Sequence, residues 1–257
     1  MYILGINAYH GDASACIFKD GVLIAAIEEE RIRRVKHWAG FPCKSIKFCL
    51  KEANIDITQI EHITIARDPS ANVFKKIAHI VKYKTSIGAI KDRLLNKKKV
   101  SNLAQEFSDC CEVEVSDIMA KIHNIEHHRS HMASAFFASP FKESAVLSID
   151  AFGDFTSTML GVGRDRKIDV LNQVNFPHSV GAFYTAFTQY LGFNHFGDEY
   201  KLMGLSPYGS PILVEQVRDV VILKDDGLFE LNLDYFTHHK KGVKTKIDSE
   251  SDPTPSR

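Results

Sequence analysis

Apolar and polar residues alternate at the start of the chain in the period-two pattern that is typical of strands. The alternation predicts strands over residues 2–7, 14–18 and 22–31. Residues 19–21, Lys-Asp-Gly, supply the Asp-Gly turn that closes a tight hairpin between the second and third of these strands. A loop of small residues, 8–14, separates the first strand from the second. The chain therefore begins with a strand–loop–strand–turn–strand unit.

The same succession of elements returns in the second half of the chain. Three further alternating segments, with a small polar loop after the first and a turn after the second, cover residues 145–150, 155–163 and 168–174. When the two copies are superposed, Asn7 falls on Asp150, and Asp12 falls on Asp154. Two copies that lie about 140 residues apart indicate a duplicated α/β architecture with two related subdomains.

Helical spacing dominates between and after these copies. Apolar residues recur at helical intervals over 43–55, whereas 63–67 is a short apolar segment that predicts a buried strand. Residues 74–100 are Lys-rich and amphipathic, which favours a solvated helical face over a nucleic-acid patch. An apolar helix is predicted over 179–193, and 197–209 is predicted to form a loop, a short helix and a Pro/Gly stop.

Composition and charge exclude several classes of protein. The 257 residues are 44% hydrophobic and 25% charged, and Lys+Arg and Asp+Glu both number 32, so the formal net charge is zero. A dedicated nucleic-acid binder would be basic, so nucleic acid is not an expected partner. Neither a signal-peptide pattern nor a long apolar run is present in the sequence, so we expect a cytoplasmic protein without a membrane partner.

The cysteines agree with that compartment. They form an odd set without a C-x-x-C pair: Cys16, Cys43, Cys49, Cys110 and Cys111. We therefore expect reduced thiols rather than a disulfide framework.

The stretch "NIEHHRSHMASAFFASPF" contains a candidate metal site. His127 and His131 are four residues apart, so on a helix they lie on one face and can reach one metal ion. Asp150, at the end of a predicted strand, is a candidate third ligand. His128 points about 100° away on a helix, so we expect a supporting or surface residue there. It also excludes a zinc metalloprotease motif, which needs Glu directly after the first His.

The alternative for these residues is structural. Two core or capping histidines and a turn aspartate would show the same spacing, and for an isolated pair this alternative is the commoner one.

The first loop is a candidate anion site. His10 lies beside Gly11, Asp12 and Ser14, and a Gly-containing turn between strands exposes backbone N–H groups that can hold a phosphate or a carbonyl group. A turn whose polar residues cap one another explains the same residues equally well. The loop has neither a G-x-G-x-x-G nor a Walker pattern.

Two later segments add basic groups. Lys36 and His37 form an irregular turn before Gly40 that could grip a phosphate or a carbamoyl carbonyl. In "GDEYKLMGLSPYG", Asp198 and Lys201 precede glycines that let the backbone approach a ligand.

Four stretches together resemble the NodU/CmcH-type O-carbamoyltransferases. They occur in the family's order and cover nearly the whole chain: "GINAYHGDASACIFKDGVLIAAIEEERIRRVKHWAGFP", "HHRSHMASAFFASPF", "VLSIDAFGDFTST" and "GDEYKLMGLSPYG". The resemblance implies an actin/Hsp70/sugar-kinase-like α/β fold, similar to the ATPase that makes threonylcarbamoyl-adenosine in tRNA. It also implies carbamoyl transfer from carbamoyl phosphate and ATP, through carbamoyl-adenylate, to a hydroxyl of a small-molecule acceptor. The resemblance further implies that this transfer takes place beside a bound metal, Fe(II) or another divalent ion.

Motif matching carries roles onto single residues. His127, His131 and Asp150 fall on metal-ligand positions, and His10 and Lys36 fall on positions that hold the carbamoyl intermediate or its phosphate. The neighbouring groups expected to bind substrate or phosphate are Gly11, Asp12, Ser14, Asp198 and Lys201.

The resemblance also implies a domain organisation. We expect subdomain I over residues 1–143 and an incomplete subdomain II over 144–257, because family members are longer and carry a C-terminal YrdC-like domain. A fragment of this kind would lack a further metal-ligand aspartate, so we expect a weak or empty metal site and no formation of carbamoyl-adenylate by the chain alone.

Two other functions remain open from the sequence. One is a relative of the tRNA-modifying threonylcarbamoyl ATPase, and the other is a non-enzymatic nucleotide- or sugar-binding module of the same fold. The segment 197–209 and the Lys36 turn favour the O-carbamoyltransferase, as does the neutral charge. Its expected partners are a nucleotide and a small-molecule hydroxyl acceptor, and homodimer formation is left open.

Overall fold

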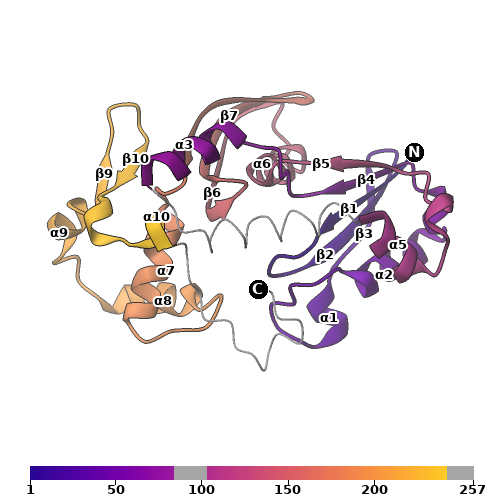
Figure 1. The fold of residues 1–257 in the computed structure, drawn as a ribbon, viewed down its shortest axis with the longest axis horizontal. Coiled ribbons are helices and arrows are strands. Elements are labelled where there is room, and N and C mark those ends of the chain that lie inside the picture. The colour runs from indigo at the N-terminus through magenta and orange to yellow at the C-terminus, as the bar shows by residue number, and fades with distance from the viewer. Residues whose placement is uncertain (84–102, 242–257) are drawn as a thin grey trace. The chain divides into compact units, whose positions relative to one another are not determined.

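The computed structural model describes residues 1–83 and 103–241 (Figure 1). These residues divide into two compact units. The first unit contains residues 1–69 and 103–125, and the second unit contains residues 70–83 and 126–241. The boundary expected after residue 143 falls inside the second unit. The chain divides before helix α6 (His127–Phe137), because this helix packs on the sheet that follows it.

The first unit is built on a five-stranded sheet of order β3-β2-β1-β4-β5. Its strands are β1 (Tyr2–Asn7), β2 (Ser14–Lys19), β3 (Val22–Glu28), β4 (His62–Ile65) and β5 (Lys121–Asn124). The first three strands pair antiparallel, β4 pairs parallel with β1, and β5 pairs parallel with β4. The predicted third strand is shorter than expected, because the chain turns into helix α1 (Glu29–Arg33) after Glu28.

Two helices cover the buried side chains of this sheet. Helix α2 (Cys43–Ala53) buries Ile46, Cys49 and Leu50, which recur at helical spacing and form one core with strand residues such as Leu4 and Ile63. Helix α5 (Leu103–Cys111) adds Phe107 to the same core. The short 3-10 helices η1 (Ile57–Gln59) and η2 (Val115–Asp117) lie in the connections.

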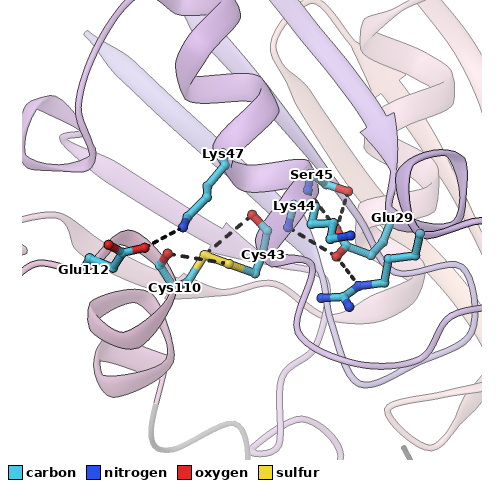
Figure 2. The surroundings of a disulfide bond; sticks show 8 residues. Glu29, Cys43, Lys44, Ser45, Lys47, Cys110 and Glu112 are labelled. Atoms are coloured by element: carbon cyan, nitrogen blue, oxygen red, sulfur yellow. Dashed lines mark hydrogen bonds and ion pairs between the residues drawn. A yellow bond between two sulfur atoms is a disulfide. The ribbon is translucent and has the colours of Figure 1, made fainter. Parts of the chain in front are cut away.

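A disulfide joins Cys43, the first residue of α2, to Cys110 in the last turn of α5 (Figure 2). The expectation of reduced thiols is therefore wrong for these two residues, and it holds for Cys16, Cys49 and Cys111. The two Cα atoms are 5.5 Å apart although 67 positions separate the residues in the chain. Cysteine spacing could not reveal the pair, because the packing of α5 on α2 brings the two sulfur atoms together.

The second unit repeats the antiparallel meander of the first. Its sheet, β6-β7-β8, consists of β6 (Glu143–Gly153), β7 (Thr156–Arg164) and β8 (Lys167–Asn175). Met132 and Phe136 of α6 pack against Val146 and Met159 of this sheet. The repetition confirms the duplicated α/β architecture that was expected for an actin/Hsp70/sugar-kinase-like fold.

The remaining elements of the second unit are mostly short helices. They are α3 (Val73–Tyr83), α7 (Val180–Tyr190), α8 (Glu199–Leu205), η3 (Ser206–Tyr208), α9 (Val214–Arg218), β9 (Val221–Leu223), β10 (Phe229–Leu231), η4 (Leu233–Tyr235) and α10 (His238–Lys241). Helix α3 confirms the start of the amphipathic segment predicted over 74–100, and the rest of that segment lies outside the described residues. None of the helices in the described part of the chain is long and apolar enough to cross a membrane.

Candidate metal-binding site

The histidine segment forms the first turns of α6. His127 is the first helical residue, and His131 follows one turn later, so the two imidazole rings meet with their centroids 4.5 Å apart. The N-cap residue, Glu126, makes no capping hydrogen bond with its side chain. The N–H group of His127 instead donates to Oδ2 of Asp154, at 3.0 Å.

Strand β6 brings Asp150 to the same place. Its Oδ2 atom lies 2.9 Å from Nε2 of His127 and 3.6 Å from Nε2 of His131. The two Nε2 atoms are 3.0 Å from each other. The structure thus brings together all three residues that the sequence suggested as metal ligands, with their ligand atoms within 4.8 Å of one another.

These three side chains are arranged better for binding a metal cation than for hydrogen bonding to one another. An imidazole nitrogen can donate or accept, but not both. If Nε2 of His127 donates to Asp150, it has no lone pair for His131; if it accepts from His131, its lone pair faces a carboxylate. A divalent ion with bonds of about 2.1 Å separates neighbouring ligands by about 3.0 Å in octahedral geometry. The three residues present can therefore hold such an ion from one side.

Asp150 is held in its charged form. Burial alone would raise the pKa of its carboxyl group, but the hydrogen bonds from His127 and the N–H group of Ala151, together with the nearby imidazole of His131, lower that pKa well below the ordinary range. The side chain of His127 is 13% exposed and that of His131 is 51% exposed, so the cluster is open to solvent on one side.

Two glycines and a serine let the backbone approach this cluster. A Cβ atom on Gly153 would lie 2.0 Å from Cδ2 of His127, so only glycine leaves room for that imidazole. A Cβ atom on Gly181 would lie 2.7 Å from the backbone of Asp150 and Ala151. Oγ of Ser179, the N-cap of α7, lies 2.7 Å from O of Ala151 and 3.1 Å from O of Asp150.

No pattern along the sequence points to all three of these supporting residues. Gly153 lies in the repeated small-residue loop after Asp150, which the sequence shows. However, His127, the residue whose ring needs the space beside Gly153, is 26 positions away on another element.

His128 lies inside the unit and not on its surface, so the surface alternative is wrong. It is fully buried, Nε2 donates to O of Thr156 at 3.0 Å, and Nδ1 accepts from Oγ of Ser148 at 2.8 Å. Burial lowers the pKa of His128 to about 4, so it remains neutral near pH 7. It therefore ties α6 to β6 and β7, and is absent from the group of converging ligand atoms.

In the first unit, the loop before β2 closes on itself. Nδ2 of Asn7 donates to the carbonyl groups of Gly11 and Asp12, at 3.3 and 3.2 Å. His10 is exposed, with Nδ1 3.2 Å from O of Gly11, and Ser14 pairs with Asn7 across β1 and β2. These contacts match the self-capped turn that the sequence left open as an alternative, and they leave the His10 imidazole at the surface.

The predicted basic turn lies beside this loop. Nζ of Lys36 is 3.0 Å from Oε1 of Glu30, and Nδ1 of His37 is 2.9 Å from Oδ1 of Asp12. Ligand atoms of Asp12, Glu30 and His37 also lie within 4.8 Å of one another. However, Lys36 and the N–H group of His37 each donate a hydrogen bond to one oxygen of Glu30. The carboxylate of Glu30 is therefore satisfied without a metal ion.

Asp198 and Lys201 of the second unit pair with each other. Nζ of Lys201 lies 2.6 Å from Oδ1 of Asp198, whose Oδ2 accepts from the N–H group of His195 at 3.1 Å. The hydrogen bond from Lys201 lowers the pKa of Asp198. The two residues thereby fasten the start of α8.

Comparison with known proteins shows the family to which this chain belongs. The family model for the carbamoyltransferase N-terminus matches residues 2–249. The chain belongs to this carbamoyltransferase family. The resemblance inferred from the four stretches of sequence is thereby confirmed, and the matched range contains the His127, His131 and Asp150 cluster.

Two longer proteins are similar to this chain in sequence. The uncharacterized protein sll1178 of Synechocystis is 39% identical over 247 residues, which cover 92% of this chain and 40% of that protein. The nodulation protein NolNO of Sinorhizobium fredii is 36% identical, over 89% of this chain and 32% of its own length. The chain therefore spans less than half the length of these relatives.

Solved structures give only slight similarities. YeaZ from Pseudomonas aeruginosa superposes with a TM-score of 0.36 and 11% identity, over 69% of this chain and 68% of that one. HypF from T. kodakarensis superposes with a TM-score of 0.38 and 12% identity, over 84% of this chain and 24% of that one. These values add nothing to the family membership.

Proposed function

We propose that this chain is the metal-binding part of an O-carbamoyltransferase that passes a carbamoyl group to a hydroxyl of a small-molecule acceptor. The observation that carries the proposal is the convergence of Nε2 of His127, Nε2 of His131 and Oδ2 of Asp150 within 4.8 Å. Membership of the carbamoyltransferase family supports the proposal that the transferred group is a carbamoyl group. ATP and carbamoyl phosphate are the proposed co-substrates, with carbamoyl-adenylate as the carbamoyl donor.

His127, His131 and Asp150 would hold the divalent ion. Two imidazoles and one carboxylate with open positions are the ligand set of many non-haem Fe(II) sites, so Fe(II) is the ion we propose. When bound, an ion of this kind supplies Lewis acidity for a carbonyl or hydroxyl oxygen.

Two residues of the first unit would handle protons and charge. Nδ1 of His10 faces the carbonyl group of Gly11, which favours the tautomer with a proton on Nδ1 and a lone pair on Nε2. That nitrogen can take the proton of an acceptor hydroxyl. The side chain of Lys36 is 73% exposed, so its ammonium group can offset the charge of a phosphate while Glu30 keeps the hydrogen bond from His37.

Metal analysis of the purified chain tests the ion. The wild type in excess Fe(II) without oxygen is expected to hold up to one weakly bound ion per chain, and a His127→Ala, His131→Ala double variant is expected to hold none. The matched control is a His62→Ala, His123→Ala double variant, which removes another pair of neighbouring imidazoles in the first unit, with Nδ1 of His62 3.0 Å from Nε2 of His123. Equal metal content in the wild type and the first variant would contradict the ligand assignment.

Calorimetric titration with carbamoyl phosphate tests the anion-binding role. Lys36→Met is expected to weaken binding about tenfold or more, because it removes a charge-assisted contact. Lys47→Met is the matched control, since Lys47 is also an exposed lysine paired with a carboxylate, that of Glu112. Equal weakening by both substitutions would show only a general loss of positive charge.

A further inference from the structure

The turn between β6 and β7 has an unfavourable backbone conformation. Gly153 pairs with Thr156, so the hairpin loop consists of two residues, Asp154 and Phe155. Their φ angles are 47° and 77°, both in the left-handed region. Two-residue hairpin turns of this kind prefer Asn-Gly or Asp-Gly, and a bulky residue such as Phe is rare at the second position. Neighbouring groups must therefore impose the conformation.

Contacts on both sides hold this turn in place. The ring of Phe155 packs against those of Phe176 and His79, with centroids 5.5 and 5.8 Å away. The N–H group of Phe176 donates to O of Phe155, at 2.9 Å. Nδ2 of Asn72 lies 3.1 Å from O of Asp154.

The turn presents its first residue to helix α6. Oδ2 of Asp154 accepts from the N–H group of His127, a first-turn donor that has no acceptor within the helix. A carboxylate at this end of a helix is also favoured by the helix dipole. Gly153, the preceding residue, makes the room that the His127 ring occupies. One tight turn thus holds the backbone of His127 and leaves space for its side chain.

We propose that Asp154 is a positioning residue for the metal site, an inference that rests on the proposed function. Asp154 is not among the converging ligand atoms. Its carboxylate acts through the backbone of His127, which it keeps at the distance where Nε2 meets Oδ2 of Asp150. The left-handed turn at residues 154 and 155 aims this carboxylate at the start of α6.

Three substitutions separate this role from a purely structural one. Asp154→Gly removes the carboxylate and relieves the left-handed backbone, since glycine adopts positive φ without cost. Asp154→Asn keeps an oxygen that caps a helix about as well as Asp and tolerates the same backbone. The control is Asp165→Gly, because Asp165 lies in the neighbouring β7–β8 turn with φ of 50°.

Two measurements read out the result. In a titration with Co(II), Asp154→Gly is expected to weaken binding about 10- to 100-fold, as for other groups that orient a metal ligand. Asp154→Asn and Asp165→Gly are expected to stay within a few-fold of the wild type. Amide hydrogen exchange in the metal-free protein is expected to show faster exchange at His127 in Asp154→Gly and not in Asp154→Asn.

The outcomes distinguish the two proposals. Wild-type Co(II) affinity in Asp154→Gly would overturn the positioning role, as would equal weakening in Asp165→Gly. If the wild type itself binds no Co(II), the proposed metal site fails, and the exchange rate at His127 then decides only whether Asp154 holds the start of α6. An exchange rate at His127 that Asp154→Gly leaves unchanged would overturn it.

Discussion

His127 and His128 are neighbours in the chain and have opposite surroundings. The first side chain is directed at a carboxylate, and the second is fully buried between a serine hydroxyl and a backbone carbonyl. Because successive residues of a helix point about 100° apart, only one of the two can face Asp150. The neutral state of His128, which follows from its lowered pKa, keeps a second positive charge away from the proposed ion.

Gly153→Ala is expected to disrupt the site and to destabilise the second unit. The added Cβ atom would meet the imidazole of His127 at 2.0 Å, so the ring must leave its position beside Asp150. We expect Co(II) affinity to fall at least tenfold and the free energy of unfolding to fall by about 1–3 kcal/mol, as for overpacked sites. Urea denaturation and Co(II) titration measure the two effects.

Gly204→Ala is the matched control for this substitution. A Cβ atom on Gly204 would have nothing within 4 Å, and the residue lies within helix α8. Alanine there is expected to preserve metal binding and to leave stability equal or slightly higher. A Gly153→Ala protein with unchanged metal affinity would show that the ring has room elsewhere.

At the scale of elements, long-range side-chain contacts hold the second unit together. Oγ of Ser157 on β7 donates to O of His178, in the segment before α7, and Nδ1 of that imidazole accepts from the N–H group of Leu231 on β10. His178 thus connects the meander to the β9–β10 hairpin, since Leu231 lies 53 positions after His178 in the chain. The connection requires an unprotonated Nδ1.

The stability of the second unit is therefore expected to fall in mild acid. Burial lowers the pKa of His178, and a nearby Glu230 offsets only part of that effect. The unfolded chain then binds a proton, near its ordinary pKa of about 6.5, that the folded chain does not bind. The free energy of unfolding should fall as pH drops below this value, by at most about 1.4 kcal/mol per pH unit for this group.

Urea denaturation between pH 7.5 and 5.5 measures the effect. In His178→Gln, an amide oxygen can accept from Leu231 without titrating, so the dependence on pH should be weaker than in the wild type. Identical slopes in the two proteins would rule out His178 as a source of acid sensitivity.

At the scale of the whole molecule, the disulfide and the candidate metal site belong to different units. Cys43 and Cys110 lie in the first unit, whereas His127, His131 and Asp150 lie in the second. The disulfide closes a loop of 67 positions, and its removal is expected to destabilise the first unit by about 2–4 kcal/mol.

Reduction with a phosphine should therefore lower the unfolding midpoint of the first unit and leave metal binding intact. A Cys43→Ala, Cys110→Ala double variant should show the same midpoint with and without the phosphine, and should bind Co(II) like the wild type. If the phosphine lowers the midpoint of this variant as well, the loss does not come from the disulfide.

Several features of this protein could be predicted from the sequence because they depend on neighbouring residues. Period-two alternation placed the strands of both meanders, and a spacing of four placed His127 and His131 on one helix face. The repeat of the strand unit indicated the duplication, and four motifs in one order indicated the carbamoyltransferase family, which the family match confirms.

Other features arise only when distant segments pack together. The Cys43–Cys110 bond spans 67 positions, and the contact from Asp154 to the N–H group of His127 spans 27. Local patterns reach only a few residues along the chain, so neither contact has a periodic signal. The burial of His128 and the room that Gly153 leaves are of the same kind. The spacing of residues along the chain indicated the candidate ligands. Only the packing of α6 on the β6–β7 hairpin brings their nitrogen and oxygen atoms close together.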